Sequence, residues 1–94
     1  MPPCAIDFTN RFAAQARALP REKRQELDSV LQRLSAAFGQ PHAHGGLGIR
    51  RLRGDYFECR IGRDLRAVFK LEGATLTMAA LGNHDDVKKF LRGL

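Results

Sequence analysis

The sequence predicts a single α+β domain in which an antiparallel sheet follows a helical hairpin. Three observations lead to this prediction. An Ala-rich segment and a longer segment with apolar residues at helical spacing flank Pro20. Three later runs alternate apolar and polar residues, which is the period of a half-buried strand. The chain has 94 residues, the size of one domain, so we expect residues 1–94 to fold around one core.

The first half of the chain is expected to form a strand and two helices. Residues 4–8 are a short apolar run suited to a strand, and Thr9 and Asn10 after it are favoured helix N-caps. The first helix stops before Pro20, and the second opens near Pro20 and ends at Gly39. The apolar stripe of the second helix consists of Leu27, Val30, Leu31, Leu34 and Phe38. Because one proline turn joins the helices, we expect them to pack as an antiparallel hairpin.

The second half is expected to form an antiparallel meander and a last helix. A loop covers residues 41–46, and a short strand over residues 48–53 leads in. Three alternating strands with glycine-containing turns between them follow at residues 56–61, 65–71 and 75–81. Their expected inward residues are Phe57, Cys59, Ile61, Leu65, Ala67, Phe69, Leu71, Leu76, Met78 and Ala80. Asn83 then caps the last helix.

The predicted order is therefore β-α-α-β-β-β-α. In this α+β architecture a twisted antiparallel sheet is packed on the helical hairpin by its apolar face. Its other face is expected to be exposed to solvent.

The composition excludes several classes of protein. Apolar residues make up 44% of the chain and none of its apolar runs approaches a bilayer span, so we expect neither disorder nor a membrane anchor. The N-terminus lacks the features of a signal peptide, so we expect a cytoplasmic protein. Cys4 and Cys59 are then expected to be reduced thiols. The three histidines lack zinc-site spacing, and no metal or cofactor is expected.

Positive charge is concentrated in one segment. The chain carries 16 Lys+Arg against 10 Asp+Glu, a net charge of +6 that favours a polyanionic partner. Residues 50–66 hold six arginines, no lysine and three acidic residues. A guanidinium forms a planar fork that suits phosphate recognition. The six arginines are Arg50, Arg51, Arg53, Arg60, Arg63 and Arg66.

The strand register is expected to place two of these arginines opposite each other. The apolar residues of the first two alternating runs must share a face, which pairs Ile61 with Leu65 across the turn. Arg60 then lies opposite Arg66, where like charges destabilise a sheet, and an anionic ligand would remove that repulsion. In the alternative interpretation, exposed sheet positions carry arginine only for solubility. Tyr56 on the same face could stack a nucleic-acid base.

Three segments resemble the RelE/ParE superfamily of bacterial toxins, the toxin halves of type II toxin–antitoxin pairs. They are residues 51–61 (RLRGDYFECRI), 64–69 (DLRAVF) and 82–87 (GNHDDV). The β-α-α-β-β-β-α order is also the order of that superfamily. RelE-like members cut mRNA, many of them in the ribosomal A site, whereas ParE-like members inhibit DNA gyrase.

For a RelE-like member, the resemblance implies metal-independent attack of an RNA 2′-hydroxyl on the adjacent phosphate. That reaction needs a proton acceptor, cations around the developing phosphorane and a proton donor for the leaving oxygen. Arg66 matches the superfamily's sheet arginine that contacts the scissile phosphate, and Arg60 matches a basic or histidine position on the neighbouring strand. Asp64 matches an acid used by some members, and His84 a histidine that several use as base or acid. Glu58 stands where ribosome-dependent members have a lysine.

The sequence therefore favours a RelE-like endoribonuclease toxin whose partners are a cognate antitoxin and mRNA, free or on the ribosome. The expected catalytic residues are Arg60, Asp64, Arg66 and His84. The expected RNA-binding residues are Arg50, Arg51, Arg53, Tyr56, Arg63, Lys88 and Lys89. A ParE-like gyrase inhibitor and a catalytically inactive nucleic-acid-binding module stay open as alternatives. His84 also has a structural interpretation as part of a favourable helix start, and His42 and His44 are interpreted as incidental loop residues.

Overall fold

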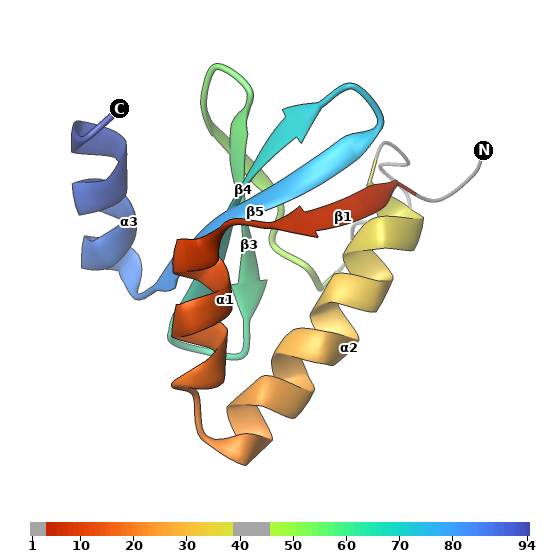
Figure 1. Cartoon of the computed structure of the whole chain (residues 1–94), viewed down its shortest axis with the longest axis vertical. Coiled ribbons are helices and arrows are strands. Elements are labelled where there is room, and N and C mark those ends of the chain that lie inside the picture. Colours follow the sequence, from red (N-terminus) through yellow and green to blue (C-terminus); the bar gives the residue numbers. More distant parts are fainter. Residues whose placement is uncertain (1–3, 39–45) are drawn as a thin grey trace.

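The computed structural model describes residues 4–38 and 46–94. Within them a five-stranded sheet and three helices follow the order β-α-α-β-β-β-β-α (Figure 1), which is the predicted order with the short lead-in strand counted as a strand of its own. The helices are α1 (Asn10–Arg17), α2 (Arg21–Ala37) and α3 (His84–Arg92). The strands are β1 (Ala5–Phe8), β2 (Arg50–Arg53), β3 (Tyr56–Ile61), β4 (Leu65–Glu72) and β5 (Thr75–Gly82). Gly39, His42 and His44 lie outside the described residues.

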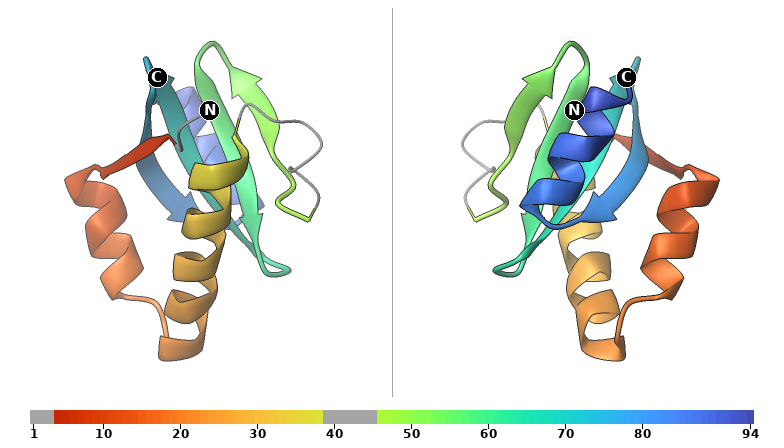
Figure 2. Two further views of the ribbon diagram at one scale, coloured as in Figure 1. Left: turned by 90° about the vertical axis from the view of Figure 1, so that its right-hand side faces the viewer. Right: turned by 90° about the vertical axis from the view of Figure 1, so that its left-hand side faces the viewer.

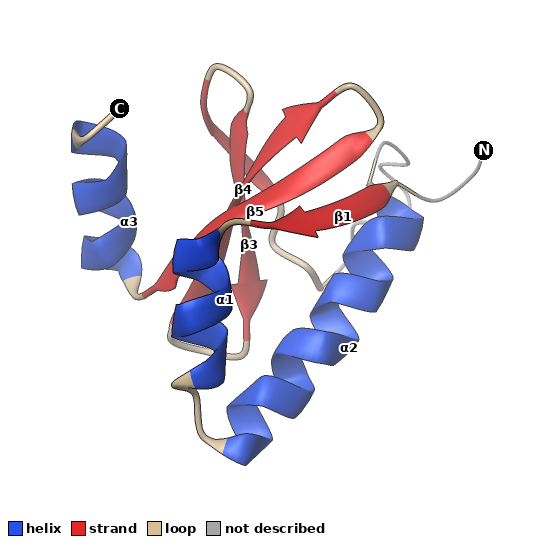
Figure 3. Cartoon of the chain, in the orientation of Figure 1, coloured by secondary structure: helices blue, strands red, loops and turns tan. Residues whose placement is uncertain are grey.

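The strand order in the sheet is β1-β5-β4-β3-β2, shown in red in Figure 3. The antiparallel meander of β2 to β5 confirms the prediction, and so do the pairing of Ile61 with Leu65 and that of Arg60 with Arg66. One pairing differs: β1 runs parallel to β5, so the sheet is mixed rather than purely antiparallel. The first strand thereby covers an edge of β5 that the meander leaves open.

One face of the sheet carries the main core and packs on α2. Leu34 is fully buried there, as predicted. The other members include Leu27, Val30, Ala37, Cys59, Ile61, Ala67, Phe69, Leu76 and Met78. Leu47 is also fully buried, although it lies before β2 in a segment that the sequence analysis treated as a connection. A single leucine among glycines offers no periodicity from which burial could be predicted.

The two helices of the hairpin diverge from Pro20 as the two arms of a V (Figure 1). Consequently α1 packs against β5 while α2 packs against β3, and the flank of α2 that faces α1 is only partly covered. Leu31 lies on that flank and is half-buried, beside the exposed ring of Phe8. The prediction that Leu31 is buried beneath the sheet is therefore wrong.

The second face of the sheet is not open, because α3 crosses it on the side opposite to α2 (Figure 2). Val87 of α3 is buried against Val68 of β4 and Ala80 of β5 in a second apolar cluster. Partly buried residues surround these three, namely Leu52, Tyr56, Phe90 and Leu91. Val68 is absent from the inward residues that the alternation predicts, yet only 1% of it is exposed. The expectation of an exposed second face holds only beyond the edge of α3.

Ala80 was predicted to face the main core and instead belongs to the second cluster. The register between β4 and β5 shifts between Val68 and Phe69, whose partners are Ala80 and Met78. One extra residue in β5 turns the following side chains to the opposite face, which is the geometry of a β-bulge. β1 ends beside Met78, and beyond that point Thr9 and Gln15 satisfy the backbone of β5 by hydrogen bonds of 3.1 Å and 2.8 Å.

None of the described helices is long and apolar enough to cross a membrane.

Candidate functional site

Glu58 contacts two arginines on the sheet face that α3 partly covers. Its Oε1 atom accepts a hydrogen bond from Nη1 of Arg66 at 3.2 Å and forms an ion pair with Nη2 of Arg50 at 3.0 Å. Arg50 lies on β2 and Arg66 on β4, and β3, which carries Glu58, pairs with both strands. Only 1% of the Glu58 side chain is exposed, against 27% for Arg66 and 64% for Arg50. We call this group the Arg50–Glu58–Arg66 cluster, and its net charge is positive.

The like-charge pair of Arg60 and Arg66 is present, but the chain itself supplies an anion. Arg66 donates to Glu58, whereas the Arg60 side chain lies along Gly48, where an added Cβ would be 3.5 Å from Arg60 Nη2. The two guanidiniums thus have different neighbours. Repulsion between them therefore does not require an external anionic ligand, which corrects that step of the sequence analysis.

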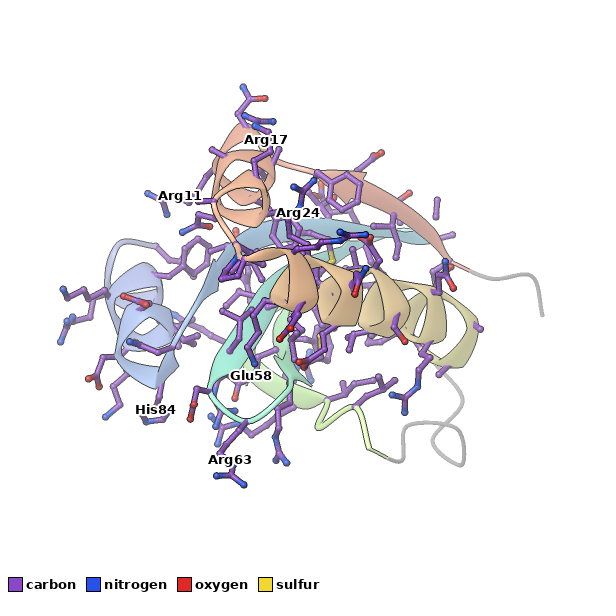
Figure 4. All side chains as sticks on the ribbon, turned by 90° about the horizontal axis from the view of Figure 1, so that it is seen from below. Arg11, Arg17, Arg24, Glu58, Arg63 and His84 are labelled. Atoms are coloured by element: carbon purple, nitrogen blue, oxygen red, sulfur yellow. The ribbon has the colours of Figure 1, made fainter. Side chains whose placement is uncertain are left out.

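The strand registers bring the expected catalytic residues to one end of the sheet. Arg66 pairs with Arg60 on one side and with Gly82 on the other. His84 follows Gly82 by two residues at the first position of α3, and Asp64 precedes Arg66 by two residues in the β3–β4 turn. Figure 4 shows His84 projecting from the same side of the molecule as Arg63 of that turn, opposite to Arg17.

The start of α3 is fixed by a reciprocal capping box. Asn83 Oδ1 accepts from the Asp86 backbone N–H and Asp86 Oδ2 accepts from the Asn83 backbone N–H, both at 2.9 Å. This pair satisfies two backbone donors and places acidic side chains at the positive end of the helix dipole. Asn83 was predicted to be the N-cap, and the structure confirms it.

A groove of about 360 Å³ lies between α3 and β2. Arg50, His84 and Lys88 contribute polar groups to its walls, while apolar contacts come from Leu52, Val87 and Leu91. Arg51 completes the lining. An apolar surface flanked by cations and an imidazole is suited to an anionic ligand that carries a flat ring.

The structure does not bring every expected RNA-binding residue to this groove. Arg51 lines the groove, but its guanidinium lies over the Phe57 ring and donates to the Gly54 carbonyl. Arg53, Tyr56 and Lys89 lie elsewhere. Arg53 donates to the Leu91 carbonyl near the C-terminal end of α3, and the Tyr56 ring packs edge-on against Phe90 at 5.6 Å. Lys89 lines a separate cavity of about 290 Å³ between α1 and α3, together with Arg11 and Gln15.

Both cysteines are free, as expected. Burial, together with the neighbouring charge of Glu58, raises the pKa of the Cys59 thiol from 9.0 to about 12. A thiol held protonated in this way is a packing residue rather than a nucleophile. Across the described residues, no group of three or more His, Cys, Asp or Glu side chains is placed to hold a metal ion.

Glu58 is the residue whose role the sequence analysis missed. In an alternating strand, a glutamate on the polar face reads as solvent-exposed. The available signal was the strand register, which pairs Glu58 with Val68 and so places Arg66 diagonally opposite it on the same face of the sheet.

No protein-family model and no curated protein sequence matches the chain. Solved structures do match it. In the RelE–RelB complex of Pyrococcus horikoshii, the TM-score is 0.71 at 15% identity, over 88% of this chain and 96% of that chain. For the intact RelBE toxin–antitoxin complex of E. coli, the TM-score is 0.64 at 19% identity, over 85% of this chain and 95% of that chain. For a YoeB/ParE toxin from Agrobacterium tumefaciens, the TM-score is 0.65 at 18% identity, over 85% of this chain and 98% of that chain.

These matches cover most of the chain, which therefore has the fold of the RelE and YoeB toxins. At identities below 20% the likeness is one of fold. It confirms the fold that the sequence resemblance implied.

Proposed function

We propose that this chain is the toxin of a type II toxin–antitoxin pair and that it is a RelE-like endoribonuclease acting on mRNA in the cytoplasm. The observation that carries the proposal is the Arg50–Glu58–Arg66 cluster, which adjoins the groove that also contains His84 and Lys88. The fold, shared with RelE chains solved as complexes with RelB, supports the toxin assignment.

The proposed reaction needs only RNA as its reactant. The 2′-oxygen forms a bond to the adjacent phosphorus, and the bond between that phosphorus and the 5′-oxygen breaks. One side chain accepts the 2′-hydroxyl proton and another protonates the leaving oxygen. The products are a 2′,3′-cyclic phosphate and a 5′-hydroxyl.

Each expected residue has a role in this scheme. Arg66 donates one N–H to Glu58, which leaves four for phosphate oxygens, and Arg60 adds a second cation beside it. These donors would stabilise the charge that develops on the phosphorane. His84 transfers a proton, since imidazole can act as either acid or base near neutral pH. Asp64 is the candidate for the second proton transfer.

The groove between α3 and β2 is the proposed seat of a neighbouring nucleotide. Its apolar surface, formed by the partly exposed Leu52 and Leu91, can contact a base, while Arg50 and Lys88 can contact flanking phosphates. Recognition of single-stranded RNA commonly combines these two kinds of contact.

An acidic antitoxin is the proposed protein partner. The net charge of +6 and the exposed arginines favour a partner of opposite sign. Production of the chain alone should arrest cell growth, and co-production of a short acidic protein encoded beside it should restore growth. Normal growth with high levels of the folded chain alone would contradict the toxin role.

The nuclease proposal is tested by incubating the purified protein with RNA, with and without ribosomes, and identifying the ends of the fragments. We expect 2′,3′-cyclic phosphate and 5′-hydroxyl ends. On free RNA, EDTA should leave the rate unchanged. Fragments with 5′-phosphate ends, or loss of cleavage of free RNA in EDTA, would refute this mechanism.

A further inference from the structure

Glu58 is the only buried charged residue among those the structure describes, and one of its two carboxylate oxygens has no hydrogen-bond partner among them. Oε1 accepts a hydrogen bond from Arg66 and is ion-paired with Arg50, while Oε2 is shielded from solvent and has no hydrogen-bond partner within the described part of the chain. A buried polar atom without a partner is unfavourable, so the arrangement calls for an explanation.

A role in stability alone accounts poorly for this geometry. A carboxylate that pairs with arginine for stability commonly uses both oxygens, in a bidentate pair. Directly across the sheet from Glu58 is Val68, which is buried in the apolar cluster beneath α3. An apolar residue in place of Glu58 would extend that cluster and would avoid burying a charge, which is often neutral or favourable for stability.

The same geometry does fix two guanidiniums. Arg66 and Arg50 have long, flexible side chains, and each has one Nη atom within 3.2 Å of the same Glu58 oxygen. Glu58 itself is held in β3, in the middle of the sheet. The remaining N–H groups of Arg66 stay unused by Glu58, and part of its side chain reaches the surface.

We infer that Glu58 is a positioning residue, which orients Arg66 toward the scissile phosphate and Arg50 toward a flanking phosphate of bound RNA. The inference rests on the proposed nuclease function. Glu58 does not contact the substrate, because it is buried. Its negative charge lowers the affinity of the site for RNA, and the orientation it imposes raises the rate of the chemical step.

Because of this trade-off, we expect substitutions of Glu58 to change kcat and KM in different ways. Glu58→Gln keeps the shape, removes the charge and weakens the hold on both arginines. We expect kcat to fall at least about 10-fold while KM for RNA stays equal or falls, because the site gains one net positive charge. Glu58→Asp keeps the charge but withdraws it by one methylene group, so kcat should fall without any gain in RNA affinity.

The experiment measures cleavage kinetics of the full chain on a short RNA, with the folded fraction of each variant determined by circular dichroism. Glu72→Gln is the matched control, since it removes one charge from an exposed glutamate at the far end of β4 from Arg66. In parallel, the arginine Nη–H signals are followed by NMR, and binding is measured with a 2′-O-methyl RNA oligonucleotide that cannot be cleaved.

We expect kinetics in Glu72→Gln close to those of the wild type, and in Glu58→Gln the kcat loss together with loss of a protected Nη–H signal. Equal kcat values in Glu58→Gln and wild type, or a loss that only follows the unfolded fraction, would overturn the inference. If the wild type cuts no RNA, the proposed function fails. The inference is then judged separately: unchanged Nη–H signals and unchanged oligonucleotide binding in Glu58→Gln would overturn it, whereas tighter binding with a lost signal would support it.

Discussion

Replacing Gly82 by alanine should disturb the start of α3. Gly82 and Gly93 are the two described glycines without a positive φ, and a methyl group added at Gly82 would meet its neighbours far more closely. An added Cβ would lie 2.4 Å from Cβ of Asp86 and 2.7 Å from its Oδ2. Ordinary contact begins near 3.4 Å, so strand and helix must separate by about 1 Å. Overpacking of this kind costs about 1–3 kcal/mol and loss of an N-cap about 1 kcal/mol more. We therefore expect the free energy of unfolding to fall by about 2–4 kcal/mol.

Urea denaturation followed by circular dichroism measures this change. Gly93→Ala is the matched control at the other end of α3, where the nearest atom to an added Cβ would be 3.6 Å away, so its effect should stay within about 0.5 kcal/mol. Because His84 begins the displaced helix, RNA cleavage by the folded fraction of Gly82→Ala should also fall. A Gly82→Ala variant as stable as Gly93→Ala would refute the placement of α3 on the sheet.

Two further predictions concern the main core. Leu34→Ala should lower the free energy of unfolding by about 2–5 kcal/mol, because Leu34 is fully buried. Leu31 is only half-buried, so Leu31→Ala should lower it by clearly less. Equal losses in urea denaturation would contradict the assignment of Leu34 to the buried face of α2. For Cys59, the raised pKa contributes stability that is present below pH 9.0 and is lost as the pH rises toward about 12. In the native protein, a thiol reagent should therefore react with Cys4 long before it reacts with Cys59, and equal reaction rates would contradict the burial of Cys59. Unfolding titrations should show the loss of stability at alkaline pH in the parent protein but not in Cys59→Ala.

The features that could be predicted from the sequence are local ones. The pairing of Ile61 with Leu65 follows from the two-residue period of the apolar side chains and a short turn, both of which lie within a dozen residues. The N-cap at Asn83 likewise depends only on its own side chain and on Asp86 three residues later. Such signals do not depend on the rest of the fold.

The features that were missed depend on distant segments. The bulge that turns Ala80 outward lies just beyond the end of β1, a strand more than sixty residues earlier. The N-cap at Asn83 indicated where α3 begins, but not that α3 would cover Val68. In both cases the partner surface is created only when the chain has folded.

The candidate site shows the same division. The arginine segment and the end of the sheet that it occupies could be read from composition and parity. The burial of Glu58 could not, because it arises from Arg50 and Arg66 reaching across from two other strands. Because charged residues are mostly exposed, a glutamate in an alternating strand is predicted to face solvent, and nothing in the pattern indicates that it contacts two arginines.

The most direct test of the account is the single-turnover rate of RNA cleavage for wild type, Arg66→Ala and His84→Ala, on free RNA and on ribosome-bound mRNA. Arg66→Ala should be slower by about 10²-fold or more, the effect of removing a preorganised donor to the transition state. His84→Ala should lose about 10²–10⁴-fold in kcat rather than in KM, with both variants still folded. Wild-type rates in His84→Ala would remove it from the mechanism, and a wild-type protein that cuts no RNA yet inhibits DNA gyrase would contradict the account.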